Sequence, residues 1–233
     1  MWLFDPYYLL YVMLPAAILT GWAQLKVKSA FARGSRIASQ RGWTGRDIAQ
    51  AILDANNIND VRIETVQGYL SDHYDPRHKV LRLSPDVYNG RSLASAGVAA
   101  HEVGHAIQHA RGYAPLAIRN AVVPMASIGS GFGMMMLMVG LAIPFLRVFT
   151  IVGAALFTMV VVFQLVNLPV EFNASKRARQ TLLTNGLVSQ QEDREVGRVL
   201  NAAAMTYVAA TIQAVLTLLY FLWRSGLIGG RRD

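Results

Sequence analysis

The sequence contains no cysteine, which excludes disulfide bonds and thiolate metal sites. Any bound metal must therefore be held by histidines and carboxylates. Charged residues are also scarce, because Asp, Glu, Lys and Arg make up 15% of the 233 residues, whereas soluble domains contain about 25%. Hydrophobic residues make up 53% of the chain. These proportions disfavour an ordinary soluble protein, a disordered chain and a fibrous repeat, and the length allows one domain or two small ones.

The hydrophobic residues are concentrated in four stretches that carry no charged side chain. The stretches run from Tyr7 to Leu25, from Ala121 to Leu146, from Val148 to Val170 and from Ala202 to Trp223. Each is close to the ~20 residues that a helix needs to cross the core of a bilayer. Buried helices of a soluble core would also be apolar, but four such stretches in a chain of this length favour four transmembrane helices.

The charges around these stretches predict their orientation in the membrane. Basic residues do not precede the first stretch, as they would in a cleavable signal peptide, but follow it. They are Lys26, Lys28, Arg33, Arg36, Arg41 and Arg46. The positive-inside rule then places the N-terminus outside and residues 26–120 in the cytoplasm. The tail departs from the rule, because Arg224, Arg231 and Arg232 would lie outside.

The formal net charge of +8 is explained by the basic residues that flank the hydrophobic stretches. Lys and Arg beside transmembrane helices set the topology and contact anionic lipid headgroups. No nucleic-acid-binding motif accompanies them. The expected partner of these basic residues is therefore the lipid bilayer and not a nucleic acid.

Small residues in the second hydrophobic stretch predict close packing between helices. Glycine occurs at positions 129, 131, 133 and 140, and small residues allow helix backbones to approach one another in lipid. The packing could be within the chain, in a hairpin formed by residues 121–170, or between copies of the chain in a homo-oligomer. The first alternative is favoured, and the sequence leaves the oligomeric state open.

These observations predict an α-helical integral membrane protein of about four transmembrane helices with a small α+β unit in the cytoplasm. The predicted segments are a first transmembrane helix (1–25), the cytoplasmic unit (26–120), a transmembrane hairpin (121–170), a second cytoplasmic segment (171–201), and a fourth transmembrane helix with the tail (202–233).

Capping and turn residues predict the secondary structure of the cytoplasmic part. Thr44 and Asp47 form a plausible capping pair for a helix over residues 45–55. Residues 61–66 and 79–83 alternate as strands do, with Asp75-Pro76 in a turn between them. A helix is expected from Leu93 to Ala110, ended by glycine and proline. Residues 172–201 are expected to form one or two further helices.

The predicted helix over residues 93–110 contains the motif HExxH. Its histidines, His101 and His105, are four residues apart and lie on one face of the helix, so both imidazoles can bind one Zn²⁺ ion at ~2.0–2.1 Å. Glu102 is rotated away from that face, so it can miss the metal and still reach a water molecule as a general base. The motif therefore predicts a single catalytic zinc ion and a zincin-like cytoplasmic unit.

A catalytic zinc usually has three protein ligands, so one more is expected. The candidates are His73, His78, His109, Glu64, Glu171, Glu192, Glu195 and the aspartates. His109 continues the spacing of four residues but lies ~12 Å from His101 along the helix axis, so a regular helix cannot bring all three histidines to one ion. Contact with a zinc ligand or with substrate, or a solvated position at the helix end, suits His109 better.

Glu171 is the stronger candidate because it directly follows the third hydrophobic stretch. A carboxylate at the membrane boundary is costly unless it is paired or bound to a metal. The alternative to a metal ligand is an interfacial glutamate paired with Lys176 or Arg177, and spacing alone does not decide between the two.

The segment of residues 72–76 offers further hydrogen-bond donors. His73 or Tyr74 could donate to the oxyanion that develops during peptide hydrolysis, although Asp-Pro also suits a plain structural turn. The strand over residues 79–83 precedes the HExxH helix, and we expect it to be the sheet edge that aligns an extended substrate by strand addition.

Several segments carry a resemblance to a known family. They are residues 22–29 (WAQLKVKS), 72–76 (DHYDP), 83–85 (LSP), 101–109 (HEVGHAIQH) and 169–175 (PVEFNAS). They resemble the membrane-bound neutral zinc metallopeptidases of the YugP type over nearly the whole chain. The chain is more distantly similar to the gluzincins, which include the HtpX and CAAX-prenyl membrane proteases.

The resemblance implies that His101, His105 and Glu171 bind zinc and that Glu102 is the catalytic base. It also implies a protein or peptide substrate and a location in the bacterial cell (inner) membrane. The membrane gluzincins usually place an aspartate four residues after the ligand glutamate, to support a zinc histidine, and here that position is Ser175. Ser175, Asn173 or an aspartate elsewhere is expected to take that part.

Two functions from different classes fit the sequence. One is a membrane-embedded zinc endopeptidase that hydrolyses membrane-associated or misfolded chains near the cytoplasmic surface. The other is a zinc-containing membrane scaffold or partner-binding protein with little or no hydrolytic activity. Glu102 favours the enzyme, because a scaffold does not need a base beside an open metal position.

Overall fold

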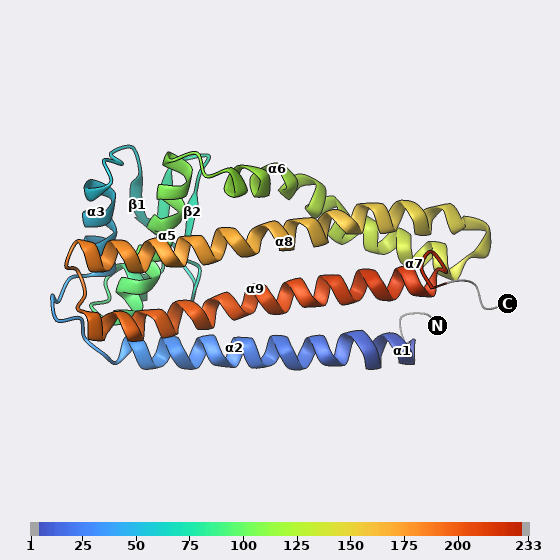
Figure 1. The fold of residues 1–233 in the computed structure, drawn as a ribbon, viewed down its shortest axis with the longest axis horizontal. Helices are drawn as coiled ribbons and strands as arrows, with labels where there is room; N and C mark the ends of the chain where they lie inside the picture. Colours follow the sequence, from blue (N-terminus) through green and yellow to red (C-terminus); the bar gives the residue numbers. More distant parts are fainter. Residues whose placement is uncertain (1–4, 230–233) are drawn as a thin grey trace. The chain divides into compact units, whose positions relative to one another are not determined.

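The structure of residues 5–229 is a computed structural model, shown in Figure 1. Arg231 and Arg232 of the tail lie outside the described residues. The elements up to the HExxH helix are α1 (Pro6–Tyr8), the π-helical segment η2 (Leu9–Met13), α2 (Leu14–Ser35), α3 (Gly45–Ala55), β1 (Arg62–Thr65), β2 (His73–Asp75), β3 (Val80–Leu83), α4 (Pro85–Tyr88) and α5 (Leu93–Ala110). They are followed by α6 (Ala114–Ile128), the π-helical segment η3 (Gly129–Gly133), α7 (Met134–Ala142), the 3-10 turn η4 (Pro144–Leu146), α8 (Arg147–Thr184) and α9 (Gln190–Arg224).

Four helical regions within residues 5–229 are long and apolar enough to cross a membrane. They are Pro6–Ser35, Ala114–Ala142, Arg147–Thr184 and Gln190–Arg224. Three of them contain a whole uncharged stretch, and Ala114–Ala142 contains the second stretch except for residues 143–146. The predicted mostly helical fold with four candidate membrane-spanning helices is thus confirmed. Helices α2, α8 and α9 continue as single helices beyond the ends of the uncharged stretches.

The chain divides into two compact units. Unit 1 comprises residues 1–22, 118–168 and 206–233, and unit 2 comprises residues 23–117 and 169–205. Unit 1 therefore contains most of the apolar residues, whereas unit 2 contains the sheet, α3, α4 and α5.

Glycines bring the helices of unit 1 together. A Cβ atom at Gly129 would lie 2.2 Å from the carbonyl oxygen of Leu156, and one at Gly140 would lie 2.4 Å from the backbone nitrogen of Thr150. Both contacts are with helix α8. Gly133 also faces α8, whereas a Cβ at Gly131 would meet nothing within 4 Å. Three of the four glycines therefore serve packing within the chain. This is the alternative that the sequence favoured over packing between copies of the chain.

The core of unit 2 is built around α5. Helix α3 packs on α5 through its buried face, and its start is fixed by the predicted capping box of Thr44 and Asp47. β2 and β3 also contact α5 (Figure 1). The largest fully buried hydrophobic side chains of this core are Ile48, Ile52, Leu53, Leu81, Leu83, Leu93, Ile107 and Leu182.

The sheet has the strand order β1-β3-β2, with β1 parallel and β2 antiparallel to β3. In the register, Ile63 lies opposite Leu81 on one side of β3, and Tyr74 lies opposite Leu81 on the other. β3 is therefore the central strand, and the prediction that residues 79–83 form a sheet edge is wrong. Its backbone groups are already paired on both sides, so it cannot receive an additional strand.

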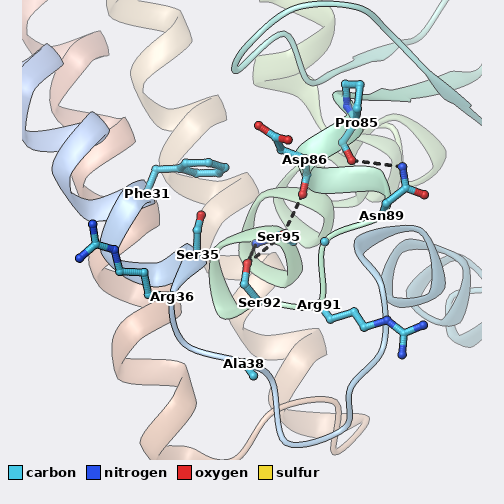
Figure 2. A pocket seen from close by; sticks show the side chains of 11 residues that line it. Phe31, Ser35, Arg36, Ala38, Pro85, Asp86, Asn89, Arg91, Ser92 and Ser95 are labelled. Carbon is cyan, nitrogen blue, oxygen red and sulfur yellow. Dashed lines mark hydrogen bonds between the residues drawn. The ribbon is translucent and has the colours of Figure 1, made fainter.

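Hydrogen bonds fix the start of α5 at its predicted position. Ser92 caps the helix by accepting a hydrogen bond from the backbone N–H of Ser95, and the two hydroxyls lie 2.9 Å apart. The Ser95 hydroxyl also donates to the carbonyl of Asp86 at 3.2 Å (Figure 2). These bonds lie beside a cavity of about 590 Å³ that contains none of the predicted site residues. The hydrogen bonds of Ser92 and Ser95 anchor the start of the HExxH helix.

Candidate metal centre

Helix α5 places the two histidines of HExxH side by side. The helix runs without interruption from Leu93 to Ala110 and ends before Gly112, which has a φ of 61°. The rings of His101 and His105 follow one another on one face, with centroids 4.9 Å apart and planes at 87°. Their Nε2 atoms point toward the same side chain on α8.

That side chain is Glu171, which is 3% exposed. Its Oε2 atom lies 3.3 Å from His101 Nε2 and 3.6 Å from His105 Nε2. Among the described residues, these three form a group whose ligand atoms all lie within 4.8 Å of one another. Arg177, one of the two cations considered for the alternative pairing of Glu171, instead contacts Asn173 and the ring of Tyr113.

The geometry and chemistry of this group fit a zinc ion. Two atoms bound tetrahedrally at ~2.0–2.1 Å are separated by about 3.3–3.4 Å, close to the two distances from Glu171 to the histidines. Two imidazole nitrogens and one carboxylate oxygen also form the usual set of a catalytic zinc site, which leaves a fourth position open. His101, His105 and Glu171 are therefore the residues that could hold the metal.

Gly104 allows α8 to approach α5 this closely. A Cβ atom at this position would lie 2.6 Å from the carbonyl oxygen of Ala174 and 3.2 Å from its Cα. Ala174 is itself fully buried. The glycine inside the HExxH motif thus has a steric reason, which is the contact of α5 with the backbone of the helix that carries Glu171.

Each histidine has a different neighbour at its other ring nitrogen. His101 Nδ1 lies 3.1 Å from the hydroxyl of Ser175, and His105 Nδ1 lies 3.1 Å from Oε1 of Gln108. Asn173 does not contact a histidine, but its side-chain oxygen accepts a hydrogen bond from Gln108. Sequence reasoning selected Ser175 and Asn173 and missed Gln108, whose position three residues after His105 on the same helix was the available signal.

Glu102 lies on the side of α5 that faces β2. Its side chain is buried, and burial raises its pKa to about 7, against the lowering effect of His101. The nearby carboxylates of Glu171 and Asp72 contribute to this raised pKa, and the backbone N–H of Tyr74 opposes it. A carboxyl with a pKa near neutrality can both accept and return a proton, as a general base requires.

Tyr74 and His109 form a pair outside the candidate ligand group. The hydroxyl of Tyr74 lies 2.9 Å from His109 Nδ1, and His109 is exposed. Burial raises the pKa of Tyr74 to about 12, so its hydroxyl remains protonated near neutral pH. As the spacing argument predicted, His109 does not join the group that His101 and His105 form with Glu171.

His73 is turned toward the β2–β3 hairpin. Its Nδ1 atom lies 2.8 Å from the carbonyl oxygen of Ser71, and its Nε2 atom lies 3.4 Å from Arg82. The predicted turn follows β2, because Asp75 ends the strand and Pro76 begins the turn. Of the two donors proposed for an oxyanion, Tyr74 is the one whose backbone N–H lowers the pKa of Glu102.

A cavity of about 640 Å³ lies beside the Tyr74–His109 pair. Polar side chains form much of its wall, and Asp60 and Lys79 make an ion pair there. Ala106 and Ala110 of α5 complete it with His109. Because Ala106 is one turn after Glu102 on the same helix face, this cavity is adjacent to the side of α5 on which Glu102 lies.

Comparison with known proteins identifies the family of the chain. Residues 8–226 match the family described as "Putative neutral zinc metallopeptidase". The chain belongs to this family. A relative of this neutral zinc metallopeptidase family in Bacillus subtilis (strain 168), named "Putative membrane protease YugP", is 43% identical over 213 residues, which cover 91% of this chain and 94% of that protein. No solved structure matches the chain.

Family membership confirms the resemblance to YugP-type proteins that the motifs indicate. The family's description implies zinc, and the group of His101, His105 and Glu171 is able to bind a metal ion. The four apolar helices, together with the relative named a membrane protease, support a membrane location for this neutral zinc metallopeptidase homologue.

Proposed function

We propose that this protein is a zinc-dependent endopeptidase that hydrolyses membrane-associated or misfolded proteins near the cytoplasmic surface of the bacterial cell membrane. The observation that carries the proposal is the convergence of His101 Nε2, His105 Nε2 and Glu171 Oε2 beside the buried carboxyl of Glu102. The family and the name of the relative support the reaction class.

In this mechanism His101, His105 and Glu171 hold the metal. Zinc, when bound, lowers the pKa of a water molecule toward ~7 and polarises the peptide carbonyl. Glu102 takes the proton from the attacking water and passes it to the leaving amine. Its burial suits this role, because a carboxyl with a pKa near neutrality exchanges protons readily at physiological pH.

Tyr74 is the donor that we assign to the developing oxyanion. Its backbone N–H lowers the pKa of Glu102, and its hydroxyl lies 2.9 Å from His109 Nδ1. His109 then contacts substrate or orients Tyr74, and His73 remains part of the hairpin. A preorganised donor of this kind stabilises negative charge where it forms in the transition state.

We assign to strand β2 the alignment of an extended substrate, which was predicted from the sequence for residues 79–83. β2 is at the end of the strand order and contacts α5. An extended peptide lying along β2 would place its backbone beside Glu102 and one side chain in the cavity that contains Asp60 and Lys79. Strand addition of this kind gives affinity through main-chain hydrogen bonds.

The decisive experiment measures zinc content by ICP-MS and casein hydrolysis on the same detergent-purified samples. The variants are Glu171→Ala, His109→Ala and Glu102→Gln beside the wild type. We expect zinc to be lost in Glu171→Ala and kept in His109→Ala, and Glu102→Gln to be zinc-loaded and inactive.

Equal zinc content in wild type and Glu171→Ala would refute the ligand assignment. Wild-type hydrolysis no faster than that of zinc-loaded Glu102→Gln would favour the scaffold instead of the peptidase. The orientation is tested separately, by labelling single cysteines introduced into this cysteine-free chain. A cysteine at exposed Gln50 of α3 should resist an impermeant thiol reagent in intact cells and react after lysis.

A further inference from the structure

Gln108 is a polar side chain buried completely beside the candidate metal centre. Its exposed fraction is 0%, and it is the largest polar residue among the fully buried side chains of the described chain. A buried amide is costly unless its donors and its acceptor are all bonded. The contacts of Gln108 therefore show what the side chain is held to.

Every polar atom of this amide has a partner. Its nitrogen donates to the backbone carbonyl of Val170 at 2.8 Å and to the side-chain oxygen of Asn173 at 3.0 Å. Both partners are acceptors, so they determine which end of the amide carries the nitrogen. The oxygen, Oε1, consequently faces His105 Nδ1 at 3.1 Å.

This orientation determines the tautomer of His105. Oε1 can only accept a hydrogen bond, so Nδ1 of His105 must carry the proton and donate it. Nε2 of the neutral ring then has its lone pair directed to the side of Glu171, 3.6 Å away. That is the form of histidine that binds a metal.

The same side chain also ties the two ligand-bearing helices together. Val170, whose carbonyl accepts from Gln108, directly precedes Glu171 on α8. Asn173 is itself oriented, because its oxygen also accepts a hydrogen bond from Arg177 at 2.6 Å. Gln108 thus connects the ring of His105 to the backbone that carries the third ligand.

We propose that Gln108 is a positioning residue of the zinc site, which selects the metal-binding tautomer of His105 and sets its place relative to Glu171. This inference rests on the proposed function. The Ser175 hydroxyl beside His101 can either donate or accept, so it does not select a tautomer in the same way.

The test compares Gln108→Met with Val103→Ala and with the wild type. Methionine has a similar length and cannot accept the hydrogen bond of His105. Val103 is a matched control, because it is fully buried on the same helix and packs in the hydrophobic core. The readouts are thermal unfolding of the zinc-free protein, zinc affinity by competition with a chelator, and the visible spectrum of the Co²⁺-substituted protein.

We expect Gln108→Met to bind zinc about 10- to 100-fold more weakly than the wild type, with altered Co²⁺ bands. Val103→Ala should lower thermal stability and leave the affinity and the bands unchanged. If Gln108→Met does not fold, Asn173→Ala replaces it, and the expected result is a smaller loss of zinc affinity in the same direction.

Two failures are distinguishable. If Gln108→Met binds zinc like the wild type, or if Val103→Ala loses affinity as strongly, then Gln108 has only a packing role and the inference is overturned. If the wild type itself binds no zinc, or binds it equally well without Glu171, the proposed function fails first, and the inference fails with it.

Discussion

The substitution Gly104→Ala tests whether the candidate metal centre depends on the close approach of α5 and α8. The added methyl group would lie 2.6 Å from the carbonyl oxygen of Ala174, whereas ordinary contacts begin at 3.4 Å. The obstructing atoms belong to backbone, so no side chain can rotate out of the way. The helices must therefore move apart by about 0.8 Å at this point.

The magnitude follows from this displacement. Metal ligands tolerate errors of only about 0.2 Å, so moving Glu171 away from the histidines should weaken zinc binding at least ~10-fold. Overpacking costs ~1–3 kcal/mol, and replacing a helical glycine by alanine recovers ~0.5–1 kcal/mol. The free energy of unfolding of the zinc-free protein should fall by roughly 1–2 kcal/mol.

Chelator competition and denaturant unfolding in detergent measure the two effects. Gly97→Ala is the matched control, because Gly97 is on the same helix and the nearest atom to its added methyl would be Cγ1 of the Val196 side chain, at 3.1 Å, whereas the nearest backbone atom of Val196 would lie at 3.9 Å. We expect this control to bind zinc like the wild type. Zinc affinity of Gly104→Ala equal to that of Gly97→Ala would refute the steric argument.

Three further predictions concern single side chains. Ser175→Ala removes the contact with His101 Nδ1 and should weaken zinc binding about 10-fold by chelator competition; unchanged affinity would mean that the hydroxyl is dispensable. Tyr74→Phe should lower kcat on casein ~100-fold with zinc content unchanged if its hydroxyl stabilises the oxyanion, and an unaltered kcat would remove it from the mechanism. The hydrogen bond with His78 holds the pKa of Asp75 below its usual range, so the carboxylate stabilises the fold above its unfolded pKa of ~3.9 and this contribution is lost as pH falls through the folded value. The Tm of zinc-free Asp75→Asn should therefore lie below that of the wild type at pH 7 and approach it below about pH 4; a constant difference would contradict the assignment.

The elements with local signals were predictable from the sequence. The helices over residues 45–55 and 93–110 have the predicted bounds, because capping side chains and glycine determine where they begin and end. Strand β2 was not predicted, since its three residues, His73–Asp75, show no hydrophobic alternation and lead directly into a turn. The central place of β3 was missed because strand order depends on contacts that a local pattern does not contain.

In the candidate site, too, only the features with a local signal were predictable from the sequence. The positions of His101, Glu102 and His105 relative to one another follow from the geometry of a single helix. Glu171 was singled out by its place after the third hydrophobic stretch and by the resemblance, but spacing alone did not separate a metal ligand from a paired interfacial glutamate. The packing of α8 against α5 brings it to the histidines. Gln108 was not predicted because a neutral amide is not one of the usual zinc ligands. Its hydrogen-bond partner, the carbonyl of Val170, is also 62 residues away along the chain.

The division of the ligands between α5 and α8 has a consequence for biosynthesis. When the ribosome has completed the HExxH helix, the nascent chain carries both histidines but not Glu171, which follows only after α6 and α7 and most of the apolar part of α8 have been made. Until then the third ligand and the anchor of Gln108 are both missing. The growing chain therefore cannot bring Glu171 to the histidines before most of the apolar part of α8, the third candidate membrane-spanning helix, has been synthesised. An incompletely translated product would lack the candidate metal centre.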